Sequence, residues 1–117
     1  MRVVNLKNNL VLAVKAAKAE SFVSRLVGLL SHSQLEKGSG LLLTNTNSIH
    51  TFFMRFAIDV AFLDRNGVVQ KTVVNLKPWR IVSPVLSAKH CLELPSGTLT
   101  LTDTCKGDRL HVETPST

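Results

Sequence analysis

The feature that most constrains the fold is an apolar run from Ser48 to Asp64, which holds four of the five Phe in the chain. Phe and β-branched residues at this density are typical of a buried strand. The run also contains His50, Arg55 and Asp59, and ionisable groups in such a segment must be paired, neutralised or functional. We therefore expect the run to contribute to the core and to carry any functional site.

Length and composition favour one soluble domain. The chain has 117 residues, of which 44% are hydrophobic and 19% charged, which is ordinary for a globular protein. No segment approaches the ~20 apolar residues of a membrane span, and we do not expect the first residues, which are charged and short of continuous apolar residues, to form a signal peptide. We expect a single cytoplasmic domain over residues 1–117; its oligomeric state is not predicted.

The net charge of +6 does not by itself indicate a nucleic-acid-binding protein. The 14 Lys and Arg are scattered along the chain, and aromatic side chains for base stacking are scarce because there is no Tyr and one Trp. The charge therefore favours a solvated basic surface, which would attract anionic small molecules or peptides.

Cysteine and histidine spacing predicts neither a disulfide framework nor a metal or cofactor site. Cys91 and Cys105 are the only two cysteines and form no CxxC motif, which suits reduced thiols. Cys91 lies in an alternating segment and is expected to be a small buried hydrophobe. Cys105 has no activating partner in the sequence and is a weak candidate nucleophile.

Turn signals divide the chain into short strands. Strands are predicted at 3–6, 10–16, 41–43, 58–63, 68–74 and 109–113, with more between Pro84 and Pro95, and one helix at 21–30. A further helical turn is expected from Ser33, a hairpin turn at Asn66-Gly67, and a turn at Ser96-Gly97 leading into Thr98 to Leu101. Without βαβ alternation, this pattern predicts an α+β fold that is mostly antiparallel β. We expect a curled sheet or partial β-barrel of eight or nine strands with one or two short helices.

The geometry of the Phe-rich run decides whether His50 and Asp59 can meet. In one continuous strand Arg55 and Asp59 share a face and His50 points away. In a hairpin with a two-residue loop, His50 comes to the Asp59 side, whereas a three-residue loop keeps them apart. Both arrangements remain open at this point.

Two interpretations of the polar residues are also open. In the functional one, His50, Thr51, Arg55 and Asp59 form the polar floor of a pocket that binds a carboxylate or phosphate through Arg55. In the structural one, Arg55 and Asp59 form a buried pair that fixes a bend.

Trp79 and Arg80 are the second candidate pair. An exposed Trp beside Arg could bind a ligand, although we favour a Trp that packs over the core. Asp64 and Asp108 adjoin turn Gly residues and are expected to serve the turns rather than catalysis.

These segments resemble domain-of-unknown-function family 192, small conserved domains of bacteria and archaea. The matching residues are Phe22, Arg25, Gly28 to Leu30, Gly40 to Leu43, Ser48 to Phe56, Ile58 to Val60, Phe62 to Asp64, Gly67, Pro78 to Arg80, Leu92 to Pro95, Gly97, Gly107 and Asp108. Ala57 stands where similar chains usually carry Pro, and Cys105 where an apolar residue is usual, which suggests that Cys105 packs inside. The resemblance implies a β-rich fold and no established activity, cofactor or catalytic residue.

The leading hypothesis is a binding or accessory module for an anionic small molecule or peptide. Its polar cleft would be built from His50, Thr51, Arg55 and Asp59 and edged by Trp79 and Arg80. The alternative is a metal-independent hydrolase or transferase in which Asp59 or Arg55 assists His50.

Overall fold

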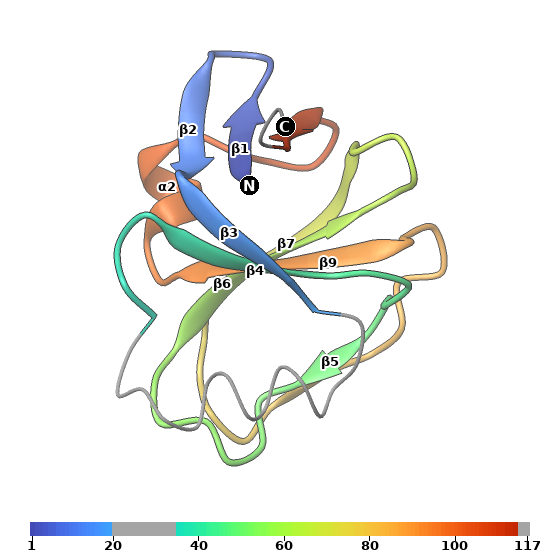
Figure 1. Ribbon diagram of the computed structural model, residues 1–117. Helices are drawn as coiled ribbons and strands as arrows, with labels where there is room; N and C mark the ends of the chain where they lie inside the picture. Colours follow the sequence, from blue (N-terminus) through green and yellow to red (C-terminus); the bar gives the residue numbers. More distant parts are fainter. Residues whose placement is uncertain (20–34, 115–117) are drawn as a thin grey trace.

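A computed structural model describes residues 1–19 and 35–114 (Figure 1). Within these residues the chain forms ten strands and one short helix. The elements are β1 (Arg2–Asn5), β2 (Leu10–Ala13), β3 (Lys15–Ala19), β4 (Ser39–Leu43), β5 (Ile49–His50), β6 (Ile58–Leu63), β7 (Val69–Leu76), β8 (Ile81–Val82), β9 (His90–Pro95), α2 (Thr98–Leu101) and β10 (Leu110–Glu113). The helix predicted at 21–30 and the start of the turn predicted from Ser33 lie outside the described residues.

The strands form three sheets, none of them closed. The largest has the order β3-β4-β9-β6-β7 and is antiparallel except for the β3–β4 pair. A second has the order β10-β1-β2, and β5 pairs with β8 in the third. The predicted class, a mostly antiparallel and incompletely closed β fold with a short helix, is confirmed.

The five-stranded sheet is buried on both faces at its inner strand β6. In Figure 1 the β1–β2 hairpin and α2 lie on one side of it and β5 on the other. Ala61 and Leu63 of β6 join the cluster beneath β1, β2 and α2, whereas Ile58, Val60 and Phe62 join the cluster toward β5 and β8. All six residues of β6 are therefore buried, which explains why this part of the run reads as continuously apolar.

The Phe-rich run is neither a continuous strand nor a hairpin, so both expected arrangements are wrong. Its first part is β5, which pairs with β8, and its last part is β6, which pairs with β7 and β9. Residues 51–57 form turns and bends between the two sheets. The run is broken because its halves hydrogen-bond to different partners, and a sequence pattern does not specify partners distant along the chain.

Local turn chemistry follows the sequence closely. The Asp64 carboxylate accepts hydrogen bonds from the backbone N–H groups of Asn66 (2.8 Å) and Val68 (2.9 Å), which closes the predicted Asn-Gly turn. The strand predicted at 10–16 is instead divided at Val14, whose N–H donates to Gly38 and so directs the chain from one sheet to another.

Candidate functional site

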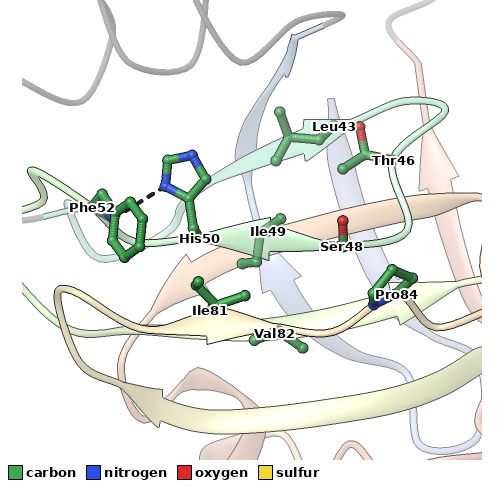
Figure 2. A pocket seen from close by; sticks show the side chains of 9 residues that line it. All are labelled: Leu43, Thr46, Ser48, Ile49, His50, Phe52, Ile81, Val82 and Pro84. Atoms are coloured by element: carbon green, nitrogen blue, oxygen red, sulfur yellow. Dashed lines mark hydrogen bonds between the residues drawn. The ribbon is translucent and has the colours of Figure 1, made fainter.

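An open, mostly apolar hollow of about 320 Å³ lies over β5 and β8 (Figure 2). Its lining residues are Leu43, Thr46, Ser48, Ile49, His50, Phe52, Ile81, Val82 and Pro84. The side chain of Ile81 is 69% exposed at its rim. A concave apolar surface with a few polar groups is the usual form of a small-molecule site, and this volume lies in the usual range.

Four aromatic rings continue from this hollow, and we call them the aromatic edge: His50, Phe52, Phe53 and Trp79. Ring centroids lie 4.6 Å apart for His50 and Phe52, 5.7 Å for Phe52 and Trp79, and 5.0 Å for Phe53 and Trp79. Phe53 is 59% exposed and Trp79 is 57% exposed, so the expectation that Trp79 packs over the core is wrong.

Both exposed rings stand on strained backbone. Phe53 has φ 69° and Trp79 has φ 64°, in the left-handed region that bulky side chains rarely adopt. Such a conformation costs about 1–3 kcal/mol and persists only where the surrounding structure imposes it.

Thr51 supplies that constraint. Its hydroxyl donates to the Lys77 carbonyl oxygen at 2.7 Å and accepts from the Arg80 N–H at 2.9 Å. Its backbone N–H donates to the Arg80 carbonyl oxygen, and its carbonyl oxygen accepts from the Trp79 N–H. Thr51 is fully buried and does not line the hollow. It acts instead by joining the two loops that carry the aromatic edge.

Asp59 also lies away from the hollow. Its carboxylate is fully buried and accepts hydrogen bonds from the backbone N–H groups of Asn75 (2.8 Å), Gly97 (3.0 Å) and Leu99 (2.9 Å). These bonds tie β6 to the end of β7 and to the start of α2, which is why residues 98–101 turn into a helix. Arg55 is exposed, and no ion pair among the described residues joins it to Asp59, so the buried pair of the structural interpretation does not form.

His50 and Asp59 are not partners. Asp59 shares the face of β6 that carries Ala61 and Leu63, opposite the face that packs toward β5. The Nδ1 atom of His50 accepts a hydrogen bond from the Phe52 N–H at 3.3 Å (Figure 2). The Asp59 carboxylate, which was considered as the group that orients His50, instead accepts hydrogen bonds from backbone N–H groups on the other face of β6.

Sequence reasoning missed three residues. The run was expected to contribute to the core, with Phe52 on its apolar face and Phe53 on the opposite face beside Thr51 and Asp59, and neither ring was considered as a ligand contact. Glu93 is fully buried on β9, on the same strand face as Cys91, and its signal was a carboxylate inside the apolar segment Leu92 to Leu94. Cys91 is buried as predicted.

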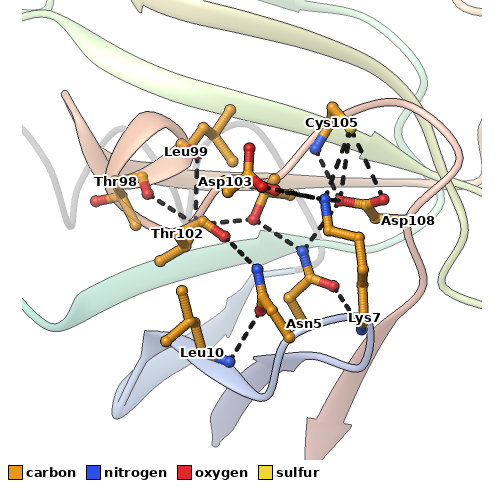
Figure 3. A network of polar contacts seen from close by, with 11 residues as sticks. Asn5, Lys7, Leu10, Thr98, Leu99, Thr102, Asp103, Cys105 and Asp108 are labelled. Atoms are coloured by element: carbon orange, nitrogen blue, oxygen red, sulfur yellow. Dashed lines mark hydrogen bonds and ion pairs between the residues drawn. The ribbon is translucent and has the colours of Figure 1, made fainter.

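A polar network at the opposite end of the molecule holds β1 against the loop before β10 (Figure 3). The Asp108 carboxylate accepts hydrogen bonds from Asn5 Nδ2 (3.1 Å) and the Cys105 N–H (3.0 Å), and pairs with Lys7 Nζ (3.0 Å). Cys105 is exposed, so the expectation that it packs inside is wrong. No group of three or more potential metal ligands occurs within the part of the chain that the structure describes.

This network changes two pKa values. Burial opposes ionisation of Asp108, but hydrogen bonds from Cys105, Lys7 and Asn5 outweigh it and lower the pKa of Asp108 from 3.8 to about 2. The hydrogen bond to Asp108 raises the pKa of Lys7 above 10.5.

Because the folded-state pKa of Asp108 is lowered, its bonds stabilise the fold above pH 3.8, and this contribution is lost as the pH falls toward 2. We expect Asp108→Asn to lower the urea midpoint at a pH of about 5 and to approach the wild type at about 2.5. The control is Asp103→Asn. This substitution removes the negative charge of a carboxylate that also pairs with Lys7 but whose side chain is 86% exposed. If the urea midpoint of Asp108→Asn fell between these two pH values as much as that of the wild type, the acid-dependent loss of stability could not be assigned to Asp108.

Comparisons with known proteins identify the family. The sequence model of DUF192, described as "Uncharacterized ACR", matches residues 3–112. A UPF0127 protein of Pyrococcus horikoshii is 39% identical over 98 residues, covering 81% of this chain and 84% of the relative. One of Pyrococcus furiosus is 38% identical over 96 residues, covering 80% and 82%. These two relatives are archaeal.

Two solved structures share the fold. One is a candidate transcription regulator from Sinorhizobium meliloti (TM-score 0.75, 20% identity, covering 94% of this chain and 89% of the other). The other is a protein of unknown function from Novosphingobium aromaticivorans (TM-score 0.77, 14% identity, covering 95% and 82%). At these identities the likeness concerns the fold alone. Among the described residues, no helix is long and apolar enough to cross a membrane.

Proposed function

We propose a binding function for this chain, which belongs to family DUF192, a family of uncharacterised proteins. The proposed ligand is a small molecule or peptide end that carries an apolar or aromatic group next to an anionic group. Its apolar part would enter the hollow over β5 and β8, and its ring would contact the aromatic edge.

The observation that carries this proposal is the pair of exposed rings on strained backbone beside an apolar hollow. Phe53 and Trp79 are both more than half exposed, and each holds a φ that costs free energy without adding to the core. Exposed apolar surface next to a cavity marks interaction sites more often than chance. Contact with a ligand would explain why Phe53 and Trp79 occupy strained and exposed positions.

The anionic part of the ligand is supported by the charges on the same loops. Arg55 follows Phe53 in one loop, and Lys77 and Arg80 flank Trp79 in the other. All three side chains are exposed, and the chain carries a net charge of +6. Arginine at such a rim can bind a carboxylate or phosphate through two parallel hydrogen bonds.

A hydrolase or transferase using His50 is less well supported. In the Ser-His-Asp arrangement, a carboxylate orients the His general base and stabilises its charged form. Asp59, the candidate for this role, is engaged with three backbone N–H groups on the other face of β6. His50 fits better as part of the wall of a binding site.

The test uses 8-anilinonaphthalene-1-sulfonate, a fluorescent aromatic anion, with N-phenyl-1-naphthylamine as its uncharged counterpart. We expect the folded protein to bind the anion, and Ile81→Asp to weaken binding about 10- to 100-fold, since one buried Ile contact is worth about 1.5–3 kcal/mol. Leu86→Asp is the matched control because Leu86 is 90% exposed and does not line the hollow. Equal affinity of the two variants for the anion would refute the site.

The same pair of probes tests the basic rim. The wild type should prefer the sulfonate to the neutral amine, and Arg55→Ala or Arg80→Ala should reduce that preference without changing the thermal midpoint. An unchanged preference in both variants would remove the anionic part of the proposal. Loss of the folded state in either variant would instead favour a structural role for that arginine.

A further inference from the structure

The β7 strand is an edge of the five-stranded sheet, and a second hollow lies along it. β7 pairs with β6 on one side, and β8 pairs with β5 on the side away from β7. An open groove of about 670 Å³ lies between β7 and β8, lined by both. In Figure 2, β8 lies between β5 and the β7 ribbon.

The free edge of β7 is bounded at both ends. At its start, Val69 exchanges backbone hydrogen bonds with Gly107 and Asp108, which covers the edge there. Near its end, Asn75 has φ 55° and donates its N–H to Asp59, so the regular strand is interrupted. For residues 70–74, no backbone bond to any described element other than β6 occurs. Within residues 1–19 and 35–114, the backbone groups of this stretch that point away from β6 have no backbone partner, and the stretch lines the groove.

The groove is basic. Lys71, Lys77 and Arg80 line it and are all exposed, and the described residues that line it include no Asp or Glu. Ile81 and Val82 add apolar surface on the opposite wall. An edge strand with apolar and cationic neighbours has the features of a site for strand addition, in which backbone bonds give affinity and alternate side chains give specificity.

We propose that this groove binds an extended acidic segment of a partner protein, added as a strand beside β7. The segment's backbone would hydrogen-bond to residues 70–74, and its apolar side chains would contact Ile81 and Val82. Its carboxylates would pair with Lys71, Lys77 and Arg80. Ile81, Val82, Lys77 and Arg80 also border the small-ligand site proposed above. Lys71 and residues 70–74 do not line that apolar hollow, so substitution of Lys71 tests this inference separately from the proposed function.

Lysines on edge strands also have a protective role, since they keep other edges from pairing. The two roles differ in their consequences. A protective Lys71 predicts that its replacement causes self-association and that acidic peptides do not bind. A binding Lys71 predicts a loss of peptide affinity while the protein remains in its original oligomeric state.

The test is fluorescence anisotropy with labelled hexapeptides in which Val or Thr alternates with Glu or Asp. We expect binding that weakens as salt increases, and no binding of the same peptides with Lys in the acidic positions. Two further versions of the acidic peptide carry N-methyl groups on alternate backbone amides, one version on the odd-numbered residues and the other on the even-numbered residues. Because alternate amides of a strand face its neighbour, only one version should lose affinity. Binding by none of the acidic peptides, or equal binding of both methylated versions, would overturn the proposal.

Variants place the site on the correct edge. Lys71→Glu should weaken binding about 10-fold or more, as expected for reversing a charge that faces a charged partner. Lys15→Glu is the matched control, because Lys15 is an exposed lysine on β3, the opposite edge of the same sheet. Equal peptide affinities of the two variants would overturn the proposal in favour of a nonspecific effect of surface charge. Wild-type dimers at micromolar concentration that Lys71→Glu dissociates would overturn it in favour of a second copy of this chain as the occupant.

Discussion

Replacing Asp59 with Ala is expected to lower the free energy of unfolding by roughly 3–5 kcal/mol. The carboxylate is fully buried and is the acceptor for the N–H groups of Asn75, Gly97 and Leu99. Removing it leaves these donors without their partner inside the fold, and α2 loses the contact that begins it. Urea unfolding monitored by fluorescence and circular dichroism would measure the change.

Asp64→Ala is the matched control for this prediction. The Asp64 carboxylate also accepts two backbone hydrogen bonds, but its turn is partly exposed, so water can replace it and the expected loss is only about 1 kcal/mol. Asp59→Asn adds a second test, because it places an NH₂ donor against backbone donors and should also destabilise strongly. A stable Asp59→Asn protein that has lost binding of the aromatic anion would instead make Asp59 a ligand-binding residue.

The second large effect is expected at Gly67. This residue has φ +84°, and a Cβ at this position would overlap the carbonyl oxygen of Leu110. The Leu110 N–H also donates to the Gly67 carbonyl oxygen at 2.8 Å, so neither backbone can move without losing this bond. We expect Gly67→Ala to cost roughly 2–4 kcal/mol, the sum of left-handed strain and forced backbone displacement.

Gly107→Ala separates these two contributions. Gly107 has φ +94°, but a Cβ at this position would meet nothing within 4 Å. Its substitution should therefore cost about 1 kcal/mol, from the left-handed conformation alone. Urea unfolding of both variants gives the difference directly. If the two substitutions cost the same, the close approach of Leu110 is relieved by a small shift and does not constrain the β10 connection.

Features that depend on neighbours in sequence could be predicted. The Asn66-Gly67 turn, the apolar faces of residues 58–63 and the burial of Cys91 all follow from local conformational preference and side-chain alternation. The resemblance to the family rested on the same residues and was equally accessible. The mostly antiparallel class followed from the number of short strands and the absence of βαβ alternation.

Features that depend on distant partners could not be predicted. Thr51 and Asp59 were expected in a polar cleft, yet both are buried because backbone groups 29 and 40 residues away need acceptors there. The exposure of Trp79 depends on Thr51 holding the loop of residues 77–80 in a strained conformation. No local sequence pattern predicts such a hydrogen bond, because its donor and its acceptor lie far apart in the chain and meet only in the folded protein.

The sequence by itself determined that the apolar segment 58–63 belongs to the core and that the run 48–64 contains unusual polar groups, because hydrophobicity and charge are properties of each side chain. Only the tertiary structure decided what those groups do. The two halves of the run join different sheets, so Asp59 faces away from His50 and serves α2, while Phe52, Phe53 and Trp79 meet at the surface. Strand pairing sets the direction of each side chain, and pairing is chosen by the whole chain.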